Sequence, residues 1–374
     1  MRAVINPSWA VKPNGEVLKN PFIVIKNGRI EAYHRRKPEG EFKKWIQIEG
    51  VLYPPFVNCH THLELSNLNF NPDNFKDFFQ WLLWIIGSRA TKTLPEIERA
   101  VRKGAELIKK SGTYYVGDIS SFGVAPSVKL PVKAVTFREF IGKDLNPKEI
   151  PPPLSIHSIY SVSATAIKKI ATDSLERGYK FQMHLAETPD EQLFAKCLPN
   201  RFESLIYPTI GRKRYEKLCA EGIVDYLKKL NALNENLIAV HCTNLSPKEA
   251  KELRKAKASA VLCPRSNLHL KTGFPPVEEL LTLEKVGLGT DGLSSNVSLS
   301  VVEELRCLYY QLGCRVPLRE LLPLITYKGA KVLNLQHYGE TALFTVAKGN
   351  HSTPFEPLIK EGQQFGILDF SNTL

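Results

Sequence analysis

Short apolar runs recur along the middle of the chain and alternate with amphipathic segments. Most runs are rich in β-branched or aromatic residues, which is typical of buried strands. Eight runs can be distinguished: Val51–Val57, Thr113–Val116, Val132–Phe137, Leu154–Ile156, Lys180–Met183, Leu237–Val240, Ala258–Leu262 and Val286–Gly289. Helix-like segments separate most of them, for example Ser163–Arg177, Ser246–Lys257 and Pro276–Lys285. Such alternation predicts parallel βα units of the α/β class, and eight units predict a closed (β/α)8 TIM barrel.

The two ends of the chain have a different pattern. Turn signals at Pro13-Asn14-Gly15 and Lys26-Asn27-Gly28 punctuate β-rich pieces near the start. Near the other end, Ala342–Val346 and Phe365–Phe370 also have strand character. We therefore expect residues 1–50 and 336–374 to form one small composite β-sandwich, beside a hydrolase barrel of residues 51–335.

Histidines gather at the carboxyl ends of the predicted strands. Five of the nine histidines lie there: His60, His62, His157, His184 and His241. TIM-barrel enzymes build their active sites at that face of the barrel. Histidines with only structural roles in the core would not be expected to gather at this face. We therefore expect a functional site at this end of the barrel.

Four of these strand-end side chains are candidate metal ligands. His60 and His62 form an HxH pair, and the period of two along a strand points both imidazoles to the same side. His184 would add a third nitrogen and Asp291 an oxygen, which leaves a position for water on one divalent ion. Zinc is the expected ion and ferrous iron the alternative, because both accept these ligands. The structural alternatives are that His60 and His62 are a hydrogen-bonded polar pair at a strand end and that Asp291 is a turn residue before glycine.

Three side chains are candidates for the chemistry itself. Asp291 would accept a proton from the activated water. Glu187, three residues beyond His184, can face the cavity and protonate a ring nitrogen, then help the departure of ammonia. His241 can stabilise the attacking water and the tetrahedral intermediate. The alternatives are a surface ion pair for Glu187 and a buried structural role for His241.

Other residues near the predicted strand ends are candidates for substrate contact or for support. Ser266 and Asn267 can hydrogen-bond to groups behind the ligands, or simply cap a helix. The substrate-contact candidates, for which core packing or surface charge is the alternative, are His157, Arg138, Glu139, Trp81, Trp84 and Arg89.

The formal net charge of +12 admits a nucleic acid, a membrane surface or an anionic ligand as partner. The basic residues, however, lie in stretches such as Arg99–Lys110 and Lys248–Lys257 that also contain glutamate, as solvated helix faces do. We therefore expect a small-molecule substrate, with no nucleic-acid or membrane partner. A mildly electropositive mouth of the site, suited to an anionic substrate, remains an alternative. A homodimer is compatible with the sequence.

Seven cysteines occur, an odd number, and none of them forms a CxxC pair. This pattern favours reduced thiols in an intracellular protein over a disulfide framework. Residues Met1–Ala10 lack the features of a signal peptide, and long uninterrupted apolar stretches are missing. The expected location is the cytoplasm.

As a set, the motifs resemble the amidohydrolase superfamily, and in particular its branch of triazine chlorohydrolases, guanine deaminases and S-adenosylhomocysteine or methylthioadenosine deaminases. The resemblance implies a barrel flanked by a sandwich from both termini, with one catalytic metal. The end of the fourth strand, near His157, lacks the lysine that often bridges two metals, which also favours one ion. The matching stretches are Pro54–His62, His184–Thr188, Val240–Cys242, Cys263–Asn267 and Gly289–Gly292.

Two further stretches, His62–Ser66 and Arg138–Gly142, resemble the aminodeoxyfutalosine deaminase subgroup. Trp84–Arg89, in contrast, lacks the glutamate with which S-adenosylhomocysteine-type deaminases bind ribose hydroxyls. The expected function is hydrolytic deamination of an amino-substituted nitrogen heterocycle, of purine or nucleoside type, such as aminodeoxyfutalosine or an adenosine derivative. The alternatives are dechlorination or amide-type hydrolysis at the same site, or a non-catalytic binding protein.

Overall fold

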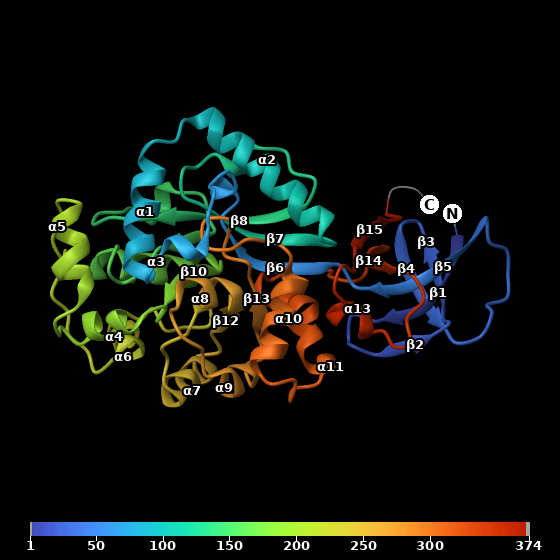
Figure 1. Ribbon diagram of the computed structural model, residues 1–374. Helices are drawn as coiled ribbons and strands as arrows, with labels where there is room; N and C mark the ends of the chain where they lie inside the picture. The colour runs from blue at the N-terminus through green and yellow to red at the C-terminus, as the bar shows by residue number, and fades with distance from the viewer. Residues whose placement is uncertain (1, 372–374) are drawn as a thin grey trace.

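The computed structural model describes residues 2–371, which form two separate sheets (Figure 1). In the larger sheet, eight strands follow one another in chain order, each parallel to its neighbours. All eight predicted apolar runs overlap these strands. The strands are β6 (Phe56–Thr61), β7 (Thr113–Ser120), β8 (Lys133–Phe140), β9 (Leu154–Ile156), β10 (Phe181–Leu185), β11 (Leu237–His241), β12 (Ser259–Leu262) and β13 (Val286–Leu288).

Backbone hydrogen bonds between the first and last of these strands close the sheet into a barrel. The amides of Thr290 and Asp291 donate to the carbonyl oxygen of His60 over 3.0 and 3.1 Å, and the amide of His62 donates to the carbonyl oxygen of Asp291 over 2.6 Å. Gly289 permits this approach, because an added Cβ there would lie 2.9 Å from the His60 carbonyl oxygen. The predicted (β/α)8 barrel is confirmed.

Helices surround the barrel, and two of the predicted helix starts are confirmed. The Ser163 hydroxyl accepts a hydrogen bond from the amide of Ala166, and that of Ser246 accepts one from the amide of Glu249. The helices are α1 (Phe78–Ala90), α2 (Leu94–Lys110), α3 (Ala164–Arg177), α4 (Pro189–Ala195), α5 (Tyr207–Thr209), α6 (Ile223–Lys229), α7 (Pro247–Lys255), α8 (Pro264–Leu270), α9 (Val277–Leu281), α10 (Val301–Gln311), α11 (Leu318–Leu321), α12 (Tyr327–Val332) and α13 (Glu356–Ile359). None of them combines the length and apolar character needed to cross a bilayer.

The smaller sheet joins strands from both ends of the chain into a β domain beside the barrel (Figure 1). Its order is β15-β14-β5-β1-β3-β4, with β2 paired to β1, so the seven strands form one continuous sheet. Its core includes Ile5, Ile23, Leu52 and Phe344. The strands are β1 (Arg2–Val11), β2 (Val17–Lys19), β3 (Phe22–Lys26), β4 (Arg29–His34), β5 (Lys44–Tyr53), β14 (Leu343–Lys348) and β15 (Phe365–Asp369).

The first predicted barrel strand, Val51–Val57, spans the junction of the two sheets and is corrected by the structure. Its first three residues end β5 of the β domain, and β6 of the barrel begins only at Phe56. Pro54 and Pro55 separate the two strands, because proline has no amide hydrogen for a sheet ladder.

The cysteine prediction is also partly wrong. A disulfide joins Cys197 to Cys219, which are 22 residues apart in the sequence. An odd cysteine count and the lack of a CxxC pair do not reveal such a bond, because only the fold shows which thiols are neighbours. Cys59, Cys242 and Cys263 are free and buried, as expected of small apolar side chains.

Candidate active site

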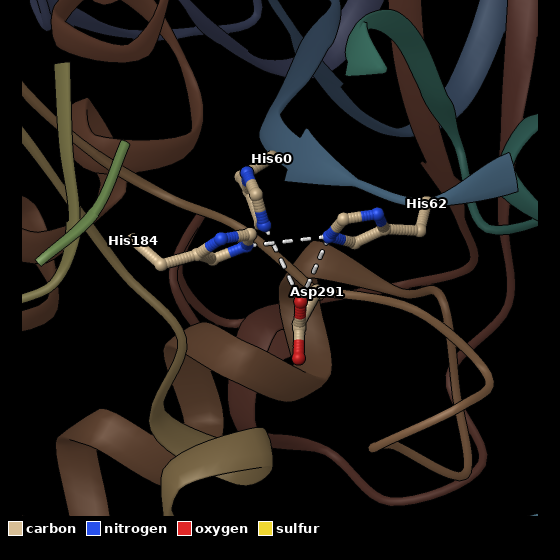
Figure 2. A group of neighbouring side chains, drawn as sticks. All are labelled: His60, His62, His184 and Asp291. Atoms are coloured by element: carbon tan, nitrogen blue, oxygen red, sulfur yellow. Dashed lines mark hydrogen bonds and ion pairs between the residues drawn. The ribbon is translucent and has the colours of Figure 1, made fainter. Parts of the chain in front are cut away.

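The four predicted metal ligands meet at the carboxyl-terminal mouth of the barrel (Figure 2). His60 lies on β6 and His62 just beyond its end, His184 lies on β10, and Asp291 follows β13. The Nε2 atoms of His60 and His62 lie 3.3 and 3.5 Å from Oδ1 of Asp291, and the Nε2 atoms of His62 and His184 are 3.4 Å apart. One ligand atom from each residue fits within 4.8 Å of all the others. This buried group can hold one metal ion.

Hydrogen bonds behind the rings orient two of the imidazoles for metal binding. His60 Nδ1 lies 2.7 Å from Oε1 of Gln182, whose amide nitrogen donates to the Cys59 carbonyl oxygen over 3.0 Å. His184 Nδ1 lies 2.8 Å from the carbonyl oxygen of His157. In both rings Nδ1 must therefore carry the hydrogen, and Nε2 turns its lone pair toward the centre.

The electrostatics of the group also fit a cation. Burial lowers the pKa of His62 to about 4, and burial together with the neighbouring imidazoles lowers the pKa of His184 well below its usual value. Burial raises the pKa of Asp291, but the nearby imidazoles of His60, His62 and His241 hold it well below its usual range. Neutral imidazoles beside an ionised carboxylate are the ligand forms that a divalent ion requires.

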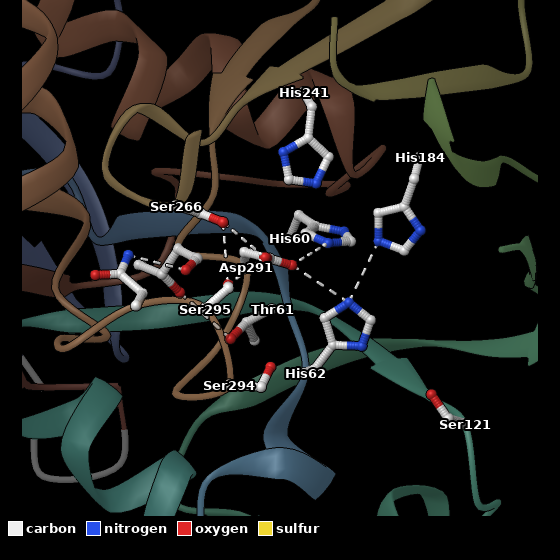
Figure 3. A network of polar contacts seen from close by, with 12 residues as sticks. His60, Thr61, His62, Ser121, His184, His241, Ser266, Asp291, Ser294 and Ser295 are labelled. Carbon is white, nitrogen blue, oxygen red and sulfur yellow. Dashed lines mark hydrogen bonds and ion pairs between the residues drawn. The ribbon is translucent and has the colours of Figure 1, made fainter. Parts of the chain in front are cut away.

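Hydroxyl groups hold Asp291 in place from the side away from the histidines (Figure 3). Its Oδ2 accepts hydrogen bonds from the hydroxyls of Ser266, over 2.9 Å, and Ser295. Oδ1 is thereby left to face the imidazoles. Ser266 lies in the first turn of α8 but does not cap it, because the N-cap is Cys263, whose side chain makes no capping hydrogen bond; of the two roles considered for Ser266, the structure shows the support of Asp291.

Glu187 and His241 lie beside the ligand group and line the same cavity. His241 Nε2 is 3.7 Å from Oε1 of Glu187, and His241 Nδ1 is 2.8 Å from Oδ1 of Asn267. Burial, and then the charges of Asp291 and Glu191, raise the pKa of Glu187 well above its usual value. This shift favours the protonated form of the acid, which can act as a proton donor.

The backbone at this mouth contains left-handed residues other than glycine. Ala186, His241, Cys242 and Asp291 have φ angles of 51°, 71°, 58° and 59°. Each lies at or just beyond the end of a barrel strand. Such conformations are uncommon for residues with a side chain and concentrate at functional sites, where surrounding contacts hold them. Here they turn the chain away from the strand at the point where ligands and the acid project.

A cavity of about 360 Å³ opens onto this group. Only some of the residues predicted to contact the substrate line this cavity. His157, Trp81 and Arg89 line it. Glu139 lies behind its wall, fully buried, with Oε2 3.6 Å from Nη2 of Arg89. This volume suits a small-molecule ligand.

Two predicted contacts do not reach the cavity. Arg138 is half-buried, and its Nη1 donates to the carbonyl oxygen of Pro151 over 3.1 Å. Trp84 packs against Phe70 and Phe75 instead. Both residues are close in the sequence to residues at the mouth of the barrel. Successive residues of a strand or of a helix turn face different sides, however, so closeness in the sequence does not place a side chain in the cavity.

Several residues of the site were not predicted from the sequence. Gln182 had a usable signal, because it lies two residues before His184 on β10 and so faces the same side. Ser295 and Glu191 carry no such signal. One cavity wall comes from the π-helical turn Phe202–Ile206 and the residues after it, for which the sequence has no distinguishing pattern. That wall consists of Ile206, Tyr207, Ile210 and Arg212.

A closed (β/α)8 barrel with a buried three-histidine, one-aspartate group and an adjacent carboxylic acid at its mouth is the architecture of a metal-dependent hydrolase. Residues 133–342 match the model of the amidohydrolase family. The chain belongs to this family.

Curated relatives and a solved structure extend the comparison. The chain is 29% identical over 341 residues to a 5'-deoxyadenosine deaminase of Methanothrix thermoacetophila, covering 84% of this chain and 76% of the relative. It is 28% identical over 353 residues to an aminodeoxyfutalosine deaminase of Deinococcus radiodurans, covering 83% and 80%. The fold is that of Helicobacter pylori aminofutalosine deaminase in complex with methylthio-coformycin, with a TM-score of 0.82, 23% identity and 97% coverage of both chains.

Proposed function

We propose that this protein is a zinc-dependent deaminase that removes the exocyclic amino group of a purine nucleoside derivative by hydrolysis. The observation that carries the proposal is the position of Glu187, a buried acid with a raised pKa, next to His241 and the metal-binding group in one cavity. The relatives named as deaminases of adenosine-type nucleosides support the same reaction.

The residues divide the proton transfers among them. When bound, the divalent ion supplies a water molecule acidified enough to act as a nucleophile near neutral pH. Asp291 accepts one proton from this water while the oxygen of the water attacks the amino-bearing carbon. Glu187 gives its proton to the adjacent ring nitrogen, and Asp291 passes the proton that it accepted to the amino group. As the carbon–nitrogen bond breaks and ammonia leaves, the proton of the added hydroxyl group goes to Glu187, which restores the acid and forms the carbonyl group of the product.

His241 positions the attacking oxygen. Its Nδ1–H donates to the side-chain oxygen of Asn267, and burial lowers its pKa to about 4. The ring is therefore neutral, and its Nε2 can accept a hydrogen from the water. Aminodeoxyfutalosine and 5'-deoxyadenosine are the first substrates to test, and zinc is the proposed ion because the three-nitrogen, one-oxygen set is typical of catalytic zinc.

Glu187 also separates this proposal from hydrolysis of a chlorinated heterocycle on the same site. Chloride leaves without a proton, whereas an amino group leaves only after it has been protonated. A buried general acid with a raised pKa therefore favours an amine as the leaving group.

The test compares the zinc-loaded protein with its Glu187→Gln variant, using ammonia release from the two compounds named above. We expect kcat to fall by about 10²- to 10⁴-fold while zinc content stays the same. Glu361→Gln, at an exposed position, is the control and should match the parent protein. Full turnover by Glu187→Gln, or no ammonia from any amino heterocycle with the zinc-loaded parent, would overturn the proposal.

A further inference from the structure

A carboxylate on α10 lies behind two of the segments that surround the metal-binding group. Glu304 is fully buried and does not line the cavity. A buried carboxylate is unfavourable unless hydrogen bonds compensate it. Its Oε2 accepts one from the amide of Arg265 over 2.9 Å, and its Oε1 accepts one from the side-chain amide of Asn296 over 2.6 Å. Glu304 thus joins the segment that follows β12 to the segment that follows β13.

The first of these segments is the start of α8. Its N-cap residue, Cys263, makes no capping hydrogen bond through its side chain, so the free amides of the first turn need another acceptor. Glu304 provides one for Arg265, which is the residue before Ser266. Glu304 therefore holds the turn from which the Ser266 hydroxyl donates to Oδ2 of Asp291.

The second segment is the loop that carries Asp291 itself. The side-chain amide of Asn296 donates to Glu304 and also to the carbonyl oxygen of Thr290, over 3.1 Å. Ser295, the neighbour of Asn296, donates its hydroxyl to Oδ2 of Asp291. Through Asn296, Glu304 holds this loop just before Asp291 and just after Ser295.

We propose that Glu304 is a positioning residue for the metal centre, because it holds both segments whose hydroxyls fix Asp291. These hydroxyls, from Ser266 and Ser295, occupy Oδ2 and leave Oδ1 directed at the imidazoles. Without Glu304 each segment can shift, and the carboxylate of Asp291 can turn away from the position of the ion. The inference rests on the proposed function, since Asp291 is both a ligand and the proton acceptor in the proposed reaction.

The test compares the parent protein with its Glu304→Gln variant. Glutamine has one acceptor oxygen, so it loses one of the two hydrogen bonds and turns an N–H donor towards the other segment. We expect the zinc Kd, measured by competition with a chelator, to rise about tenfold, which is the lower end of the range for groups that support metal ligands. In the zinc-loaded protein, kcat for ammonia release from 5'-deoxyadenosine should fall by about the same factor. KM should stay the same, because Glu304 does not line the cavity.

Glu303→Gln is the matched control. Glu303 precedes Glu304 on α10 but is only half-buried, and its carboxylate lies 2.7 Å from Nη1 of Arg306. This variant should keep the parental zinc Kd and kcat. If Glu304→Gln does not fold, Asn296→Ala tests the contact to the loop by itself, and the zinc Kd should again rise.

A double-mutant cycle separates positioning from a general loss of stability. A background with both Ser266→Ala and Ser295→Ala lacks the hydroxyls through which Glu304 acts, so adding Glu304→Gln to it should change the zinc Kd by no more than about twofold. A full tenfold rise in that background would overturn the inference. A lower Tm of Glu304→Gln with unchanged zinc Kd and kcat would overturn it as well. No ammonia release by the zinc-loaded parent would instead refute the deaminase function, and the zinc Kd values would still decide the role of Glu304.

Discussion

The backbone amide of His62 donates to the carbonyl oxygen of Asp291 over 2.6 Å, while His62 Nε2 lies 3.5 Å from Oδ1 of the same residue. His62 follows the first strand of the barrel, and Asp291 follows the last. A hydrogen bond that closes the barrel is thus made by two of the candidate metal ligands. Barrel closure and assembly of the site are the same structural event.

Metal removal should therefore weaken the fold as well as the reaction. An ion bound across the seam between β6 and β13 stabilises only the closed barrel, by about 2.7 kcal/mol when the free ion is at a hundred times its Kd. We expect a chelator to lower Tm by several degrees and zinc to restore it, as measured by calorimetry. His62→Ala should lose this response to the chelator, and an equal response in that variant would place the ion elsewhere.

Gln182 offers a test of how the ligands are oriented. It accepts the hydrogen of His60 Nδ1 over 2.7 Å, so Gln182→Met should leave that ring free to turn. Partners of this kind contribute about 10- to 100-fold to metal affinity. We expect the zinc Kd, measured by competition with a chelator, to rise by that factor. Gln311→Met, at an exposed position of α10, should leave the Kd unchanged; the same Kd in both variants would argue against this role.

Asp118 predicts a dependence of stability on pH. Burial raises its pKa to about 8, whereas the ordinary value is 3.8. Between these two pH values the folded chain binds more protons than the unfolded chain, so the free energy of unfolding falls as pH rises, by a few kcal/mol at most from this group. Asp118→Asn keeps an acceptor for the Leu63 amide and should flatten that slope in urea unfolding measured at pH 5 and pH 8. Asp144→Asn, which is exposed, should keep the parental slope, and a parental slope in Asp118→Asn would contradict the assignment.

The disulfide predicts a response to reductant. Closing a loop between residues 22 apart restricts the unfolded chain and contributes about 3 kcal/mol. We expect dithiothreitol to lower the free energy of unfolding by that amount. A variant with both Cys197→Ser and Cys219→Ser should start at the lower value and show no further change with reductant. Cys314→Ser, at an exposed free thiol, should respond as the parent does, and a parent insensitive to reductant would contradict the prediction.

The alternation of apolar runs with helix-like segments was enough to predict the barrel, because strands buried on both faces need continuous apolar stretches. The metal ligands could be predicted for a related reason. Residues that follow parallel strands must converge at one face of a barrel, so His60, His184 and Asp291 could be grouped although they are far apart in the sequence. The run Val51–Val57 shows the limit, since apolar character alone does not reveal that Pro54 and Pro55 divide it between two sheets.

The sequence by itself therefore determined the barrel, its four candidate metal ligands and the nearby acid, because each depends on local periodicity and on strand ends. The tertiary structure alone decided that Arg212 faces the cavity, that Arg138 and Trp84 do not, and that Cys197 pairs with Cys219. These features depend on how loops and helix turns pack against segments distant in the sequence. Packing of this kind is set by the whole chain and leaves no periodic trace in any one stretch of it.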